Sequence, residues 1–165
     1  MAVETMKVQI GYVQGVHGLR GDLKIKNRSE MEDRIYKVGN EIYLNDEKHV
    51  ITACKFYKGF YLVTIDNMKD INKVEHYIGY DVFIDREILN LSESEYLLED
   101  LIDLNILCDG ENLGRVISIE NNGKYNILVI HYEKEYRIPL LDEFVIKVDL
   151  GNKSILCKDI KGLIL

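Results

Sequence analysis

The chain has 165 residues, of which 47% are hydrophobic and 30% charged, and its formal net charge is −7. That apolar content excludes a disordered chain, and the lack of any apolar run of about 18 residues excludes a membrane-spanning helix. Residues 1–90 hold 13 Lys and Arg against 14 Asp and Glu, whereas residues 91–165 hold 8 against 14. Because surfaces that bind nucleic acid through phosphates are usually basic, we expect the second half to bind a basic or mixed protein surface instead.

The N-terminus and the cysteines indicate a reducing compartment. Met1 to Lys7 contains Glu4 and lacks the apolar core of a signal peptide, so we expect a cytoplasmic protein. The three cysteines are far apart and form no C-x-x-C pair; they are Cys54, Cys108 and Cys157. This spacing argues against a disulfide framework and against a zinc site, and favours cysteines that act as small buried hydrophobic residues.

The first distinctive stretch is G-V-H-G-L-R-G, residues 15–21, which separates two strand patterns, Lys7–Val13 and Leu23–Asn27. Glycine tolerates positive φ and close backbone contact, so the spacing predicts a tight, shaped loop. We interpret three residues as structural glycines: Gly15, Gly18 and Gly21. The side chains expected to point outward are those of His17, Leu19 and Arg20.

A basic stripe follows the loop. Lys24, Lys26 and Arg28 alternate with Leu23, Ile25 and Asn27, which places the three cations on one face of a strand. The stripe is a candidate contact for RNA or protein, and it is equally consistent with the solvated face of an amphipathic strand.

The remainder of the first half predicts more strands and one helix. The expected strands are Glu41–Leu44, Val50–Tyr57, Phe60–Ile65 and Tyr80–Ile84, with a hairpin turn at Lys58-Gly59. Asp70–Gly79 predicts a helix with Asp70 as N-cap and with Ile71, Val74 and Ile78 on one face. About six short strands with close turns indicate a small β-barrel.

The polar stretch Asp85–Ser94 predicts a domain boundary. We expect an N-terminal barrel domain over 1–87, a linker over 88–95 and a C-terminal domain over 96–165. In the last of these, Asp109-Gly110 and Asn122-Gly123 predict hairpin turns, and Leu141–Phe144 predicts one helical turn. Five or six strands in succession indicate an all-β meander and a second barrel.

H-G-L-R-G at His17–Gly21, followed by Asp22 and a basic-alternating strand, resembles the N-terminal signature of the RimM family. The resemblance covers nearly the whole chain. Four further matches carry it: Phe56–Leu62 around a lysine-glycine turn, Asp70–Arg86, the D-L-I block Asp100–Ile102, and Ile138-Pro139 with Val145–Lys153. It implies an all-β protein of two small barrels with one or two short helices: a six-stranded barrel like those of translation factors, then a PRC barrel.

The resemblance also implies a function. Proteins of this family are ribosome maturation factors, assembly chaperones without catalytic chemistry. They bind a ribosomal protein in the head of the small (30S) ribosomal subunit and promote late head assembly and 16S rRNA processing. The implied partners are therefore that head protein and the assembling subunit with its 16S rRNA. We expect a monomer with no cofactor, no metal, no membrane partner and no small-molecule substrate.

The family usually has two adjacent aromatic residues just before D-L-I, which are implicated in binding the head protein; this chain has Tyr96 and Leu97. We expect Tyr96 to be an exposed apolar anchor ringed by acidic residues, whereas for Leu97 a contact role and packing on the second barrel are equally favoured. The candidate contacts are thus His17, Leu19, Arg20, Lys24, Lys26, Arg28, Tyr96 and Leu97.

Two rival functions are weaker. A small-molecule enzyme would need a pocket at the Gly15–Gly21 loop, near His17 and Asp22, with converging polar groups and a shifted pKa. The glycine spacing matches no nucleotide-binding motif. A membrane-associated PRC-type scaffold is disfavoured by the N-terminal barrel and by the lack of an anchor segment.

Overall fold

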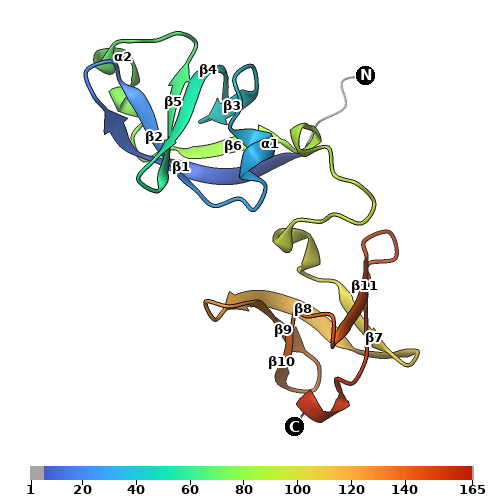
Figure 1. Ribbon diagram of the computed structural model, residues 1–165. Helices are drawn as coiled ribbons and strands as arrows, with labels where there is room; N and C mark the ends of the chain where they lie inside the picture. Colours follow the sequence, from blue (N-terminus) through green and yellow to red (C-terminus); the bar gives the residue numbers. More distant parts are fainter. Residues whose placement is uncertain (1–5, 165) are drawn as a thin grey trace. The chain divides into compact units, whose positions relative to one another are not determined.

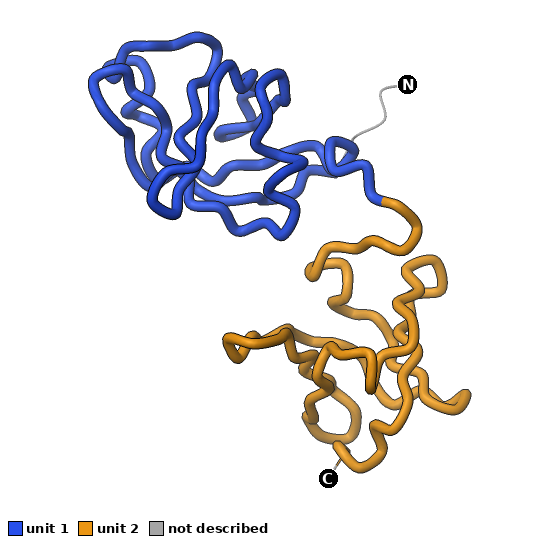
Figure 2. Tube along the Cα trace, in the orientation of Figure 1, with its two compact units in different colours: residues 1–91 blue, residues 92–165 orange. Residues whose placement is uncertain are grey.

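Residues 6–164, which the computed structural model describes, form two six-stranded sheets (Figure 1). The sheets belong to two compact units, residues 1–91 and 92–165 (Figure 2). The predicted all-β fold class is confirmed. The prediction that no signal peptide is present concerns mainly residues 1–5, which lie outside the described residues.

The first unit is a closed barrel with the strand order β1-β2-β5-β4-β3-β6. Its strands are β1 (Lys7–His17), β2 (Asp22–Asn27), β3 (Glu41–Leu44), β4 (Glu47–Tyr57), β5 (Phe60–Ile65) and β6 (Asp81–Asp85). Alternate residues point inward, and Ile10, Leu23, Ile25, Ile42 and Val63 are fully buried. The Lys58-Gly59 turn has φ of 50° and 87°, as a two-residue hairpin turn requires. The six-stranded barrel predicted for this half is therefore confirmed.

The connection between β1 and β2 is shorter than predicted. β1 does not end at Val13 but continues to His17, because a β-bulge between Val13 and Gly15 lets the strand stay paired as far as His17 and Asp22. The remaining turn, residues 18–21, closes with a hydrogen bond of 3.1 Å from the Gly21 N–H to the Gly18 carbonyl. Gly15 thus lies in a strand and not in the loop.

The helix predicted at Asp70–Gly79 is present, but it changes from an α-helix to a 3₁₀ helix. α2 (Ile71–Val74) is α-helical, and η1 (Glu75–Tyr77) is a 3₁₀ turn. Asp70 caps the helix by accepting a hydrogen bond from the Asn72 N–H at 2.9 Å. Because a 3₁₀ turn has three residues, Tyr77 replaces Ile78 on the buried face. The prediction for Ile78 was wrong: its side chain is 46% exposed, against 4% for Tyr77.

Two other short helices belong to this unit. α1 (Glu32–Ile35) buries Ile35. η2 (Arg86–Leu89) follows β6 and buries Leu89. The Arg34 guanidinium donates a hydrogen bond of 2.9 Å to the Leu89 carbonyl, which links α1 to η2.

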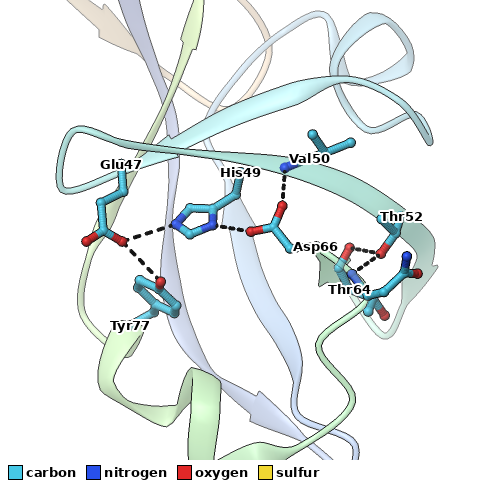
Figure 3. Close-up of polar contacts among 8 residues, drawn as sticks. Glu47, His49, Val50, Thr52, Thr64, Asp66 and Tyr77 are labelled. Carbon is cyan, nitrogen blue, oxygen red and sulfur yellow. Dashed lines mark hydrogen bonds and ion pairs between the residues drawn. The ribbon is translucent and has the colours of Figure 1, made fainter.

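A polar cluster joins β4, the end of β5 and η1 (Figure 3). The buried His49 lies with its Nδ1 2.5 Å from Asp66 Oδ2 and its Nε2 3.4 Å from Glu47 Oε2. Since a carboxylate can only accept, Nδ1 carries the shared hydrogen. Asp66 also accepts from the Val50 N–H at 2.9 Å, and the Tyr77 hydroxyl donates to Glu47 at 3.2 Å. Burial raises the pKa of Asp66, but the Val50 N–H and His49 outweigh it and hold that pKa below its ordinary value.

Asp66→Asn should therefore make the free energy of unfolding less dependent on pH in the acidic range. A carboxyl group with a lowered folded-state pKa stabilises the protein above its unfolded pKa of about 4, and that stabilisation is lost as pH falls through the folded value. Asp66 has φ of 50°, which asparagine tolerates, so the backbone is preserved. We expect a loss of about 1 kcal/mol at pH 7 that shrinks towards pH 2, measured by urea unfolding at several pH values. An unchanged pH dependence in the variant would contradict this role of Asp66.

The second unit is a six-stranded sheet with the order β10-β9-β8-β7-β12-β11. Its strands are β7 (Asn105–Cys108), β8 (Glu111–Asn121), β9 (Asn126–His131), β10 (Glu135–Pro139), β11 (Val145–Asp149) and β12 (Ser154–Cys157). The prediction of a simple meander was wrong, because β12 pairs in parallel with β7 and brings Ser154 opposite Asn105. The short helices η3 (Leu98–Leu101) and η4 (Lys161–Leu163) flank the sheet in sequence.

The core of this unit contains two of the cysteines. Cys108 and Cys157 are 2% and 3% exposed among residues such as Ile106, Leu128 and Ile155, and neither forms a disulfide. Burial, and then the nearby Cys108, raise the pKa of Cys157 to about 12. Both thiols therefore act as small apolar core groups, as the sequence predicts.

Candidate functional site

The turn between β1 and β2 presents its side chains to solvent. His17, Leu19 and Arg20 are all exposed, Leu19 by 88%. The Leu19 carbonyl accepts a hydrogen bond of 3.2 Å from the Ile71 N–H, which fixes the turn against α2. The His17 ring lies 5.5 Å from the ring of Tyr57, a residue of β4 that the sequence did not single out.

The three glycines of this region differ in what their positions require. Gly18 and Gly21 both have φ of +70°, and a Cβ on Gly21 would lie 2.6 Å from Val74 Cγ2 and 2.8 Å from Ile71 Cα. A Cβ on Gly15 would meet nothing within 4 Å, and Gly15 has no positive φ. The backbone therefore demands glycine at positions 18 and 21, and the interpretation of Gly15 as a required glycine is not supported.

The basic stripe lies on the outer face of β2. Leu23 and Ile25 are fully buried, so Lys24 and Lys26 point away from the core. Lys24 Nζ lies 4.2 Å and Lys26 Nζ 5.4 Å from the centre of the Phe60 ring, and Arg28 Cζ lies 4.8 Å from that of Tyr12. Each cation of the stripe thus lies over an aromatic ring that the strand pattern alone did not link to it.

A hollow of about 320 Å³ adjoins this face. Its lining residues are Arg20, Asp22, Thr52, Ala53, Cys54, Lys55, Leu62, Thr64, Asn67 and Lys69. The Thr64 hydroxyl donates to Asp22 Oδ1 at 2.8 Å, which holds the one acidic side chain in place. This is the pocket that the enzyme alternative requires, but His17 does not line it. Burial raises the pKa of the Cys54 thiol, which disfavours the thiolate that a nucleophile would need.

Tyr96 and Leu97 occupy different environments. Tyr96 is half-buried and packs against the core of the second unit. Leu97 is only 6% exposed, and its N–H donates to the Asp100 carboxylate at 2.9 Å, at the start of η3. Of the two interpretations of Leu97, the structure supports packing, so its side chain is not an exposed anchor. Tyr96 also has more contact with the core than an isolated exposed anchor would.

An apolar groove opens between η3 and β8. It has a volume of about 510 Å³ and is lined by Leu98, Glu99, Ile102, Ile117, Ser118, Ile119, Glu120, Asn121 and Asn126. The bulge between Val116 and Ser118 turns Ile117 outward, where it is 39% exposed. Arg137 donates two hydrogen bonds to Glu120, at 3.0 and 3.1 Å, and these lower the pKa of that carboxyl group. This groove was not predicted from the sequence.

Within residues 6–164 no three His, Cys, Asp or Glu side chains are grouped as metal ligands would be. No helix in the same part of the chain has the length and apolar character needed to cross a membrane.

Comparisons with known proteins cover both units. The model of the RimM N-terminal domain matches residues 8–89, and that of the RimM PRC barrel domain matches residues 98–163. Proteins named ribosome maturation factor RimM from Staphylococcus aureus (strain bovine RF122 / ET3-1) and Staphylococcus haemolyticus (strain JCSC1435) are each 31% identical over 166 residues, covering 96% of this chain and 99% of theirs. A crystal structure from Pseudomonas aeruginosa, described as a 16S ribosomal RNA processing protein RimM, aligns with a TM-score of 0.45 and 17% identity over 93% of this chain and 97% of its own.

Proposed function

This chain belongs to the RimM family of ribosome maturation factors, and on that premise we propose that it binds a ribosomal protein in the head of the small ribosomal subunit and thereby promotes late head assembly and 16S rRNA processing. It acts by binding and not by catalysis, as a cytoplasmic monomer. The names of the relatives place the family in ribosome maturation and in 16S rRNA processing. The choice of a head protein rests on the features of the second unit.

The observation that carries the proposal is an apolar groove in an acidic unit. Ile117, Ile102 and Leu98 provide apolar surface, while Glu99 and Glu120 stand at the same groove. The second half of the chain carries 8 Lys and Arg against 14 Asp and Glu, a net −6. A basic protein with an apolar side chain to bury is the complementary partner, because opposite charge steers the encounter and apolar burial holds it.

Tyr96 extends the apolar surface of this contact. It lies two residues before Leu98, and it is half-buried on the core, so its ring is held in place before any partner binds. A side chain that is already fixed loses little conformational entropy on binding. The first unit contributes through Arg20 and the basic stripe, which face ribosomal RNA.

A pull-down with the full chain tests this function. We expect purified small-subunit precursors, and isolated head proteins, to be retained by the wild type and about tenfold less by Tyr96→Ala or Ile117→Ala. An interface anchor that contributes about 1.4 kcal/mol or more changes the affinity by that factor. Binding should also weaken as salt is raised, because the unit is acidic.

Ile146 supplies the matched control. It is an isoleucine of the same unit, 61% exposed on β11, and it does not line the groove. Ile146→Ala should bind like the wild type, and both isoleucine variants, which lose exposed side chains, should keep the melting temperature within a few degrees. Full retention of head proteins by both groove variants would refute the proposed contact.

A further inference from the structure

Four lysines and two aromatic residues gather on the outer face of three neighbouring strands, β2, β5 and β4, and at the turn that joins β4 to β5. We call Lys24, Lys26, Lys55, Tyr57, Lys58 and Phe60 the aromatic-basic face. Strand register places them together: Lys24 and Lys55 both stand opposite Leu62, and Tyr57 stands opposite Phe60. Residues directly opposite each other in adjacent strands share a face of the sheet, so these side chains lie on one surface.

Tyr57 is the accessible ring of this face. It is the last residue of β4, pairs with Phe60 beside the turn, and is 42% exposed. Lys58 Nζ and Lys55 Nζ lie 5.3 and 6.0 Å from its ring centre, and the His17 ring lies 5.5 Å away at 59°. The ring is therefore bordered by cationic and aromatic groups, and part of it remains open to a flat ligand.

The positive charge of this face is not balanced by acidic residues in the same strand segments. The segments 23–28 and 51–65 contain five Lys and Arg and no Asp or Glu, although the first unit as a whole is near neutral. Lys7, Lys48, Arg115, Arg137 and Lys161 form ion pairs elsewhere on the chain, and none of them belongs to this face. Cations that are not neutralised by neighbouring carboxylates are available to an anionic partner.

The hollow continues the face. Lys55 belongs to both, and the hollow is also lined by Arg20, Lys69 and Thr64. Asp22 is its single acidic side chain, and Oδ1 of that carboxylate already accepts from Thr64. A ring flanked by lysines beside a cation-lined hollow fits a chain that alternates flat bases with phosphates.

We propose that the aromatic-basic face binds an unpaired stretch of RNA, with one base stacked on Tyr57 and neighbouring phosphates held by Lys24 and Lys55. Single-stranded nucleic acid is recognised by stacking on aromatic side chains within a positively charged groove, whereas a duplex keeps its bases stacked internally and offers mainly phosphates and groove edges. The inference rests on the proposed function only in taking ribosomal RNA as the source of the strand.

Fluorescence anisotropy of a labelled ten-nucleotide single-stranded RNA with the full chain tests it. Tyr57→Ala should weaken binding about tenfold or more, and Tyr57→Phe, which keeps the stacking surface, should stay within about twofold of the wild type. Lys24→Ala should weaken binding and reduce the slope of log Kd against log salt by about 0.7 to 1, the value of one phosphate contact. A duplex RNA of equal length should bind more weakly than the single strand.

Tyr132 provides the matched control, because it is a tyrosine of the second unit with a similar exposure of 38%. Tyr132→Ala should bind the RNA as the wild type does. Equal affinity of Tyr57→Ala and wild type, or equal affinity for duplex and single strand, would overturn the inference. A loss of head-protein retention in Tyr57→Ala with RNA binding unchanged would overturn it in favour of a protein contact. The two proposals can fail independently. The proposed function is tested by the retention of head proteins by the groove variants, whereas this inference is tested by RNA binding.

Discussion

Gly21→Ala is expected to destabilise the first unit by about 2 to 5 kcal/mol. A left-handed backbone costs an L-residue about 1 to 2 kcal/mol, and forcing extra atoms into a packed site costs about 1 to 3 kcal/mol more. Both apply at this position, which has φ of +70° and would bring the new Cβ 2.6 Å from Val74 Cγ2 and 2.8 Å from Ile71 Cα. Because Ile71 Cα is backbone, rotation of a side chain cannot relieve that contact, and α2 must shift.

The neighbouring glycines separate the two causes. Gly18 has the same φ of +70° with nothing within 4 Å, so Gly18→Ala should cost only the backbone part, about 1 to 2 kcal/mol. Gly15 has neither constraint, so Gly15→Ala should change stability by less than about 1 kcal/mol and can even raise it. Urea unfolding followed by circular dichroism, with hydrogen exchange to assign the change to the first unit, measures the series. If all three variants were equally stable, the account of the turn and its contact with α2 would be wrong.

Leu101→Ala should destabilise the second unit by about 2 to 5 kcal/mol, the range for a leucine removed from a packed core. Leu101 belongs to the D-L-I block, ends η3 and is fully buried with Leu104, Val116 and Ile130. Removing the Leu101 side chain leaves a cavity beneath η3, the helix whose residues Leu98 and Glu99 line one side of the groove. We therefore expect Leu101→Ala to weaken head-protein retention as well, in proportion to the unfolded fraction.

Leu150 is the control for that change, since the same substitution at a 36% exposed leucine removes little packing. Leu150→Ala should alter the free energy of unfolding by about 0.5 kcal/mol or less. Differential scanning calorimetry and urea unfolding compare the two variants. A Leu101→Ala protein as stable as Leu150→Ala would show that the D-L-I block does not anchor η3.

Features set by neighbouring residues could be predicted from the sequence. Alternation placed Leu23 and Ile25 inside and Lys24 and Lys26 outside, and the Lys58-Gly59 and Asp109-Gly110 pairs adopt the positive φ values that two-residue hairpins need. Asp70 caps its helix as predicted. Each of these depends on a few consecutive residues, for which periodicity and turn chemistry are sufficient.

Features set by distant residues could not be predicted. Nothing in residues 105–108 or 154–157 indicates that the two strands pair in parallel, because that register depends on how the intervening strands fold. The 3₁₀ turn that exchanges Ile78 for Tyr77 has no local signal either. The same holds for the candidate site. The basic stripe follows from consecutive residues of one strand. The strand register that brings Tyr57 and Phe60 beside it, and the bulge that turns Ile117 into the groove, depend on how the sheets are paired.

The parallel pairing of β7 with β12 has a consequence for how the protein is made. The hairpins β8-β9 and β9-β10 join near neighbours in sequence, so they can form while the ribosome is still elongating the chain. β7 gains its second partner only when Ser154–Cys157 has left the exit tunnel, roughly fifty residues after β7 itself. Until then one side of β7 has no partner strand, and such an edge invites association with other chains. The second unit can thus complete its sheet only once β12 is available, whereas the pairing of β1 with β6 needs no residue of the second unit.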